Sequence, residues 1–143
     1  MANIPDLSQG AGMPSQWSED LTAVDVALIT GHMPAVLTVD MTYALSQNIP
    51  ALTPVGFDAN GDLVPAVSGG ATPIQAIGIN LIPVVTPATG AKKAAPTYRG
   101  GCFNPDKLNW PASFDTEAEK FNAFNGAPTP TSIVIRRPKT ATV

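Results

Sequence analysis

Residues 98–126 read YRGGCFNPDKLNWPASFDTEAEKFNAFNG, and they carry the strongest structural signals in the chain. The second half of this stretch predicts one short helix. Thr116 and Glu119 have the spacing of a capping box, and the neighbouring acidic residues favour the positive end of a helix dipole. Gly126 can end the helix, because glycine tolerates the left-handed conformation that follows many helices.

The same stretch is rich in aromatic residues, which predict a small core around the helix. A strand that ends near Phe103 precedes Trp110, and Pro111 restricts the backbone before the helix begins. We expect the indole of Trp110 to close the core over the helix, with Phe121 and Phe124 on the buried side of the helix. The residues assigned to this motif are Tyr98, Phe103, Trp110, Pro111, Phe121 and Phe124.

Upstream of this motif the patterns favour strands. AVLTVDM (35–41) and ALTPVGF (51–57) are β-branched runs bounded by proline and glycine, and Asn60-Gly61 predicts a hairpin turn after the second run. IQAIGINLIPVV (74–85) suits a buried strand, TGAKKAAPT (89–97) is expected to be a loop, and TSIVIRR (131–137) is expected to be a final strand.

The N-terminal part lacks such patterns. Residues 1–20 show no hydrophobic period, and residues 21–31 fit a short helix and a strand equally well. We therefore divide the chain into a flexible N-terminal arm (1–27), a β-rich domain (28–137) and a C-terminal tail (138–143).

Composition supports a single, mainly β domain with one short α-helix (α+β). The 143 residues include 12 glycines and 15 prolines, and only 13% are charged, which disfavours a helix-rich fold. The formal net charge of −3 gives no electrostatic reason to bind nucleic acid or an anionic membrane.

Charge is divided unevenly along the chain. Residues 1–91 contain seven carboxylates and no lysine or arginine, whereas residues 92–143 contain eight basic residues and four acidic ones. The two halves can complement one another within a subunit or an oligomer, or they can form a polarised face for a partner. The uncharged span from Leu63 to Ala91 has enough apolar surface to predict a stable oligomer.

Motifs for chemistry are missing from the sequence. His32 is the only histidine and has no nucleophile elbow with it, and Cys102 lies in an apolar context typical of a buried thiol. DANGD (58–62) resembles a calcium loop but has glycine at the wrong position, so a hairpin turn explains it. Phosphate-binding glycine motifs are absent as well. We expect no catalysis, no cofactor and no metal, and hence a structural or binding protein.

The order and spacing of these segments resemble the head decoration proteins of tailed bacteriophages. The resemblance runs from about Leu28 to Ile135 and is clearest in residues 98–126. Residues 29–66 are similar to the opening strand, linker and hairpin of that family, and QAIGINLIPV is similar to the strand that follows. This chain differs by a longer segment before Leu28 and by the proline-rich NGAPTPT (125–131).

The resemblance implies a β-clip fold of bent β-ribbon, assembled as a homotrimer on the outer surface of the phage head. Its partner would be the major capsid protein at three-fold sites, where the trimer resists the pressure of packaged DNA. In this picture the arm binds the capsid through Ile4, Leu7 and Trp17, and three arms on one trimer multiply a weak contact. The first 27 residues lack the pattern of a signal peptide, which predicts synthesis in the cytoplasm of a bacterial host.

Two other classes of protein are weaker alternatives. A trimeric β-clip hydrolase of the dUTPase type would need ordered carboxylates and phosphate-binding motifs. A carbohydrate-binding tail or adhesin module would need exposed aromatic residues on the body, and the chain has only two tryptophans.

Overall fold

The structure is a computed structural model that describes residues 28–126 and 131–138. The strands are β2 (Ile29–Gly31), β3 (Leu37–Tyr43), β4 (Asn48–Ile49), β5 (Pro54–Phe57), β6 (Leu63–Pro65), β7 (Gly78–Asn80), β8 (Val84–Val85), β9 (Lys93–Phe103) and β10 (Ser132–Ile135). The helices are α1 (Glu117–Asn122) and a 3₁₀ turn at Pro105–Lys107. A mainly β fold with one short α-helix is therefore confirmed.

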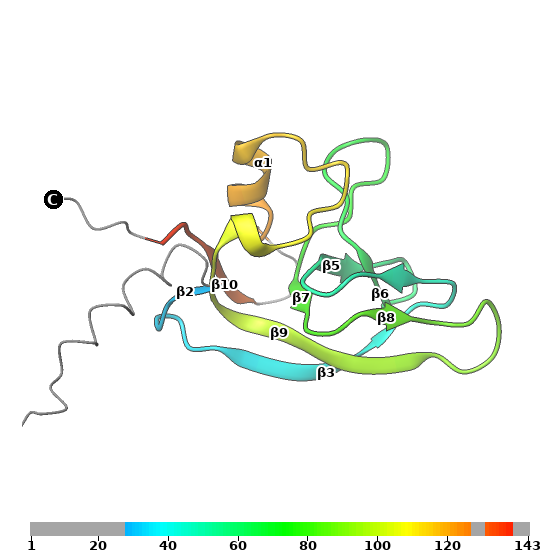
Figure 1. Ribbon diagram of the computed structural model, residues 1–143. Coiled ribbons are helices and arrows are strands. Elements are labelled where there is room, and N and C mark those ends of the chain that lie inside the picture. The colour runs from blue at the N-terminus through cyan, green and yellow to red at the C-terminus, as the bar shows by residue number, and fades with distance from the viewer. Residues whose placement is uncertain (1–27, 127–130, 139–143) are drawn as a thin grey trace, which may run out of the picture.

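The longest strand, β9, organises the sheet (Figure 1). Its first part pairs antiparallel with β3 on one edge, from Lys93 opposite Tyr43 to Gly100 opposite Leu37. On its other edge Thr97 and Tyr98 pair with β7. Since β3, β6, β5 and β7 are neighbours in that order, the sheet closes on itself as a small barrel. The last residues of β9 extend beyond the barrel and pair with β10 and β2.

The predicted hairpin is confirmed. β5 and β6 pair antiparallel, with Phe57 opposite Leu63, and the connection contains Asn60 and Gly61. Only Gly61 has a positive φ, of 84°, so the glycine supplies the left-handed conformation. The carboxylate of Asp58 holds the turn by accepting bonds from the backbone N–H groups of Asn60 (2.8 Å) and Asp62 (3.0 Å).

Buried side chains form two separate cores. The inner cluster, inside the barrel, consists of Tyr43, Ile49, Val55, Leu63, Ile77, Val84 and Ala95. The outer cluster, between the barrel and α1, consists of Ala66, Ala76, Ile79, Phe103, Leu108, Phe114, Ala123, Phe124 and Ile133. One strand, β9, thus contributes to both cores, with Ala95 in the inner cluster and Phe103 in the outer cluster.

Two expectations for the middle of the chain were wrong. Residues 93–97, expected in a loop, begin β9, because pairing with β3 imposes an extended backbone on a segment without a strand pattern. Residues 74–85 do not form one strand. The buried amide of Asn80 donates to the carbonyls of Pro50 and Ile82, both at 2.8 Å, and the chain turns between β7 and β8.

The uncharged span buries several of its large apolar side chains inside the subunit. Its large side chains Leu63, Ile77, Ile79 and Val84 are fully buried within the subunit, although Ile82 and Val85 are exposed. Ile82 and Val85 are the large apolar side chains that this span leaves exposed, and the oligomer stays a prediction. In the ambiguous segment 21–31, residues 29–31 form a strand, and the rest lies outside the described residues.

Candidate functional site

The residues expected to bind a partner through the arm, Ile4, Leu7 and Trp17, lie outside the described residues. Their role stays a prediction, as does the division of the chain into arm, domain and tail. The body motif can be followed in full: Tyr98 and Phe103 lie on β9, and its other residues lie in the connection between β9 and β10.

The aromatic motif packs around the outer cluster. Phe103 and Phe124 are buried in this cluster, and Tyr98 and Trp110 pack against it from its partly exposed side. The rings of Tyr98 and Phe103 are 4.9 Å apart between centroids. Four of the predicted core residues therefore meet in one place, and Pro111 is half-buried beside them.

Trp110 is fixed by two contacts of different kinds. Its indole Nε1 donates to the carbonyl oxygen of Pro105 at 2.9 Å, and its ring lies 5.2 Å from that of Phe114. The polar edge of the indole is thereby satisfied inside the subunit, as a half-buried tryptophan requires. Phe114 itself belongs to the core, and sequence reasoning missed it because no period marks a loop residue.

The prediction for Phe121 was wrong. Its side chain is 36% exposed, whereas Phe124 is buried. α1 ends at Asn122, so the two aromatic residues do not share one helical face. The guanidinium of Arg137 lies over the ring of Phe121, 5.4 Å from its centroid, which is a cation–π contact at the surface.

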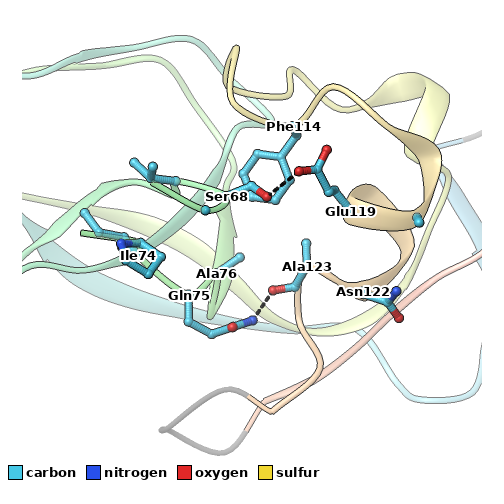
Figure 2. Close-up of a pocket in the computed structure, with 12 residues that line it drawn as sticks. Ser68, Ile74, Gln75, Ala76, Phe114, Glu119, Asn122 and Ala123 are labelled. Atoms are coloured by element: carbon cyan, nitrogen blue, oxygen red, sulfur yellow. Dashed lines mark hydrogen bonds between the residues drawn. The ribbon is translucent and has the colours of Figure 1, made fainter. Parts of the chain in front are cut away.

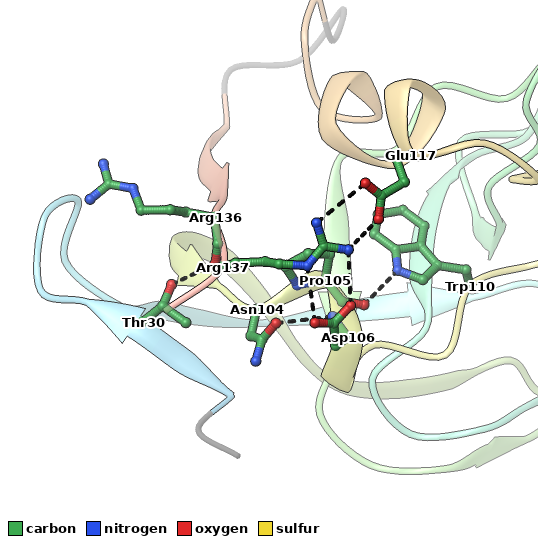
Figure 3. Close-up of polar contacts among 8 residues, drawn as sticks. All are labelled: Thr30, Asn104, Pro105, Asp106, Trp110, Glu117, Arg136 and Arg137. Carbon is green, nitrogen blue, oxygen red and sulfur yellow. Dashed lines mark hydrogen bonds and ion pairs between the residues drawn. The ribbon is translucent and has the colours of Figure 1, made fainter. Parts of the chain in front are cut away.

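Arg137 connects the C-terminal strand to two other elements (Figure 3). Its guanidinium donates to both oxygens of Asp106, at 3.1 and 3.2 Å, and to the carboxylate of Glu117 at the start of α1. These hydrogen bonds lower the pKa of Asp106 and the pKa of Glu117. The charge distribution allowed the acidic and basic halves to complement one another within a subunit, but Arg137 pairs within its own half of the sequence.

The start of α1 also forms one wall of a surface cavity of about 400 Å³ (Figure 2). The Oγ of Ser68 donates to Glu119 at 2.9 Å across the cavity, and the side-chain amide of Gln75 donates to the carbonyl of Ala123. Glu119 also completes the predicted capping box with Thr116, and bonds from Thr116 and Ser68 lower its pKa. These polar groups are engaged in holding α1 on the barrel.

The residues considered for chemistry are dispersed. His32 is exposed in the connection between β2 and β3, while Cys102 is buried and lies 3.3 Å from the hydroxyl of Thr30. Asp58 is engaged in its own turn. Within residues 28–126 and 131–138, no three histidine, cysteine or acidic side chains come together to hold a metal ion. Nor does the described part contain a helix long and apolar enough to cross a membrane.

Comparison with known proteins gives one clear result. Residues 17–128 match the family model of the bacteriophage lambda head decoration protein D. The match includes β2 through α1 and therefore the whole barrel and the aromatic motif. A comparison with curated proteins finds no match.

Proposed function

Because the chain belongs to the bacteriophage lambda head decoration protein D family, we propose that it binds as a homotrimer to three-fold sites on the outer surface of the mature phage head. There it holds neighbouring major capsid protein subunits together against the pressure of packaged DNA. The family match carries this proposal, since it supports a structural role in decorating the phage capsid and a location in the virion.

Attachment through the arm is part of the proposal. The first 27 residues have too little apolar surface to fold alone, so they can order on a partner by adding a strand to an exposed sheet edge. We assign this contact to Ile4, Leu7 and Trp17. The body, which we assign to the β-clip type, sits above the junction, and the protein is made in the cytoplasm of the bacterial host.

The alternative functions find less support in the body. A carbohydrate-binding module needs an exposed aromatic platform, but the indole N–H of Trp110 is bonded to Pro105 and its ring packs on Phe114. A hydrolase needs carboxylates directed at a substrate, but Asp58 holds a turn and Asp62 pairs with Lys92 at 2.5 Å.

A binding experiment tests the proposal. Purified protein is mixed with undecorated expanded capsids, and unexpanded capsids serve as the control; both are imaged by cryo-microscopy. We expect density at the three-fold sites of expanded capsids and a higher temperature of capsid disruption after binding. Absence of binding to expanded capsids would reject the proposed function.

A further inference from the structure

Two asparagines of the chain are followed directly by glycine, Asn60 before Gly61 and Asn125 before Gly126, and all four residues are exposed. The side-chain amide of an asparagine can react with the backbone nitrogen of the next residue. Glycine favours this reaction, because it has no Cβ to obstruct the approach. The two pairs are therefore chemically equivalent, and the folded structure around them makes them different.

The fold holds the first pair in place. The backbone N–H of Gly61, which carries the reacting nitrogen, donates to the carbonyl of Asp58 at 3.1 Å. The backbone N–H of Asn60 donates to the carboxylate of Asp58 at 2.8 Å. The turn joins β5 and β6, whose pairing fixes both of its ends. Reaction at Asn60 therefore requires several hydrogen bonds to open first.

The second pair is restrained less. It belongs to the turn that follows α1, which ends at Asn122. Asn125 is bonded to that residue through its backbone N–H, at 3.0 Å to the carbonyl, and through its amide Nδ2, at 2.9 Å to the side-chain oxygen. The backbone N–H of Gly126, however, donates to no other residue in the described part of the chain. The reacting nitrogen of this pair is therefore not engaged there.

We propose that Asn125 is a site of spontaneous deamidation in the folded protein and that the hairpin protects Asn60. The backbone nitrogen of Gly126 attacks Cγ of Asn125 and forms an N–Cγ bond. The bond between Cγ and Nδ2 breaks, and Nδ2 leaves as ammonia together with the proton from the Gly126 nitrogen. Water then opens the succinimide ring at either carbonyl, which leaves aspartate or isoaspartate at position 125. The reaction needs no partner, so it does not depend on the proposed function.

The product changes the end of α1. Deamidation removes the amide that donates to the side chain of Asn122, and it places a carboxylate near the negative end of the helix dipole. Isoaspartate also lengthens the main chain by a methylene group directly after Phe124, which is buried in the outer cluster. We therefore expect an aged protein to hold α1 less firmly on the barrel than a newly made one.

Peptide mapping by mass spectrometry tests the site. The full chain is incubated at neutral pH, folded in one sample and unfolded in urea in another, and conversion at each asparagine is followed with time. In the folded protein we expect Asn125 to react about tenfold faster than Asn60, because hydrogen bonds that must open first raise the barrier at Asn60. In urea the two rates should become nearly equal. Equal rates in the folded protein, or the same ratio of rates in urea, would overturn the inference.

Detection of isoaspartate tests the ring intermediate. Labelling by an isoaspartyl methyltransferase should mark the incubated wild type. Asn125→Gln should lose most of this label, because the longer side chain closes a ring far more slowly, and Asn60→Gln is the matched control that should keep it. A label that survives in Asn125→Gln would place the reaction elsewhere, and aspartate without isoaspartate at position 125 would contradict the succinimide.

The melting temperature Tm tests the consequence for α1. Incubation should lower the Tm of the wild type and leave that of Asn125→Gln unchanged. A wild type that keeps its Tm after complete conversion at Asn125 would overturn the expected loosening of α1.

Discussion

Trp110 and Phe121 contact neighbouring parts of the molecule but differ in what they contribute to folding. Trp110 packs against the outer cluster and donates its indole N–H to the carbonyl of Pro105, whereas Phe121 is 36% exposed and lies against Arg137. We predict that Trp110→Ala lowers the free energy of unfolding by about 3 kcal/mol, the low end for a large aromatic truncation, because the ring is only partly buried.

Urea unfolding at one fixed subunit concentration measures this loss. Phe121→Ala is the control and should cost less than about 1 kcal/mol, as surface substitutions do. A Trp110→Ala protein that unfolds like the wild type but fails to decorate capsids would move Trp110 from the core to the capsid interface.

The pKa of Tyr43 allows a prediction of how the stability of the fold depends on pH. Burial raises the pKa of the Tyr43 hydroxyl, and the 2.7 Å hydrogen bond with Thr97 only partly offsets that rise. A tyrosine with a raised pKa in the folded state keeps its proton while the unfolded chain loses it. Its contribution is therefore complete below the unfolded pKa near 10 and falls as the pH rises above that value.

The measurement is the melting temperature Tm between pH 8 and pH 11. We expect Tm of the wild type to fall above about pH 10, and Tyr43→Phe to reduce the slope of that fall. Equal slopes for the two proteins would mean that another group controls the alkaline transition.

At the scale of the element, α1 depends on its first turn. It has only six residues, and helices this short gain little from intrinsic propensity. The hydroxyl of Thr116 accepts from the backbone N–H of Glu119 at 3.3 Å, and the Glu119 carboxylate accepts from the backbone N–H of Thr116 at 2.9 Å. We predict that Thr116→Ala lowers the free energy of unfolding by about 1 kcal/mol.

Thr116→Ser is the control, because it keeps the hydroxyl and should cost much less. Thermal unfolding of both variants at equal concentration gives the comparison. If the serine and alanine variants are equally destabilised, then the methyl group of Thr116 stabilises the fold and its capping hydroxyl does not.

The elements also show which features could be predicted from the sequence. α1 and the β5–β6 hairpin were predicted correctly because their signals are local: a capping box and a glycine with positive φ. The start of β9 could not be predicted, since Lys93–Thr97 is extended only because β3 lies beside it. The burial of Phe121 was predicted wrongly because the helix is shorter than its sequence pattern.

For the aromatic motif, the sequence predicted which residues form the core but not which other residues contact and hold them. Composition indicated a small core of Phe103, Phe124 and Trp110, and the structure brings these together. The contributions of Phe114, Asn80 and Arg137 depend on contacts between segments distant in sequence. No short pattern contains that information.

For the whole molecule, the structure shows how the acidic and basic halves of the sequence are paired. Lys92 and Asp62, 2.5 Å apart, are the ion pair that joins the acidic and basic halves among the described residues. Arg137 pairs instead with Asp106 and Glu117, all in the basic half. Much of the complementary charge is therefore not used within the described subunit and is available for contacts between copies or with the capsid.

The last prediction concerns Trp17, at the start of the segment that matches the family. This tryptophan lies among serine, glutamine and acidic residues, and tryptophan is a favoured residue at the centre of interfaces. We predict that Trp17→Ala weakens capsid binding by roughly 2 kcal/mol per arm and leaves the mass of the free protein unchanged. Gln16→Ala is the control, because it truncates the neighbouring side chain and keeps Trp17, and it should bind capsids like the wild type. Occupancy on expanded capsids, measured over a concentration series, distinguishes the variants.

Limited proteolysis adds a second measurement, since residues 1–20 should be cleaved in the free protein and protected on capsids. Wild-type occupancy for Trp17→Ala would move the anchor to Leu7 or Ile4, and equal protection of the arm in both states would show that it does not order on the capsid.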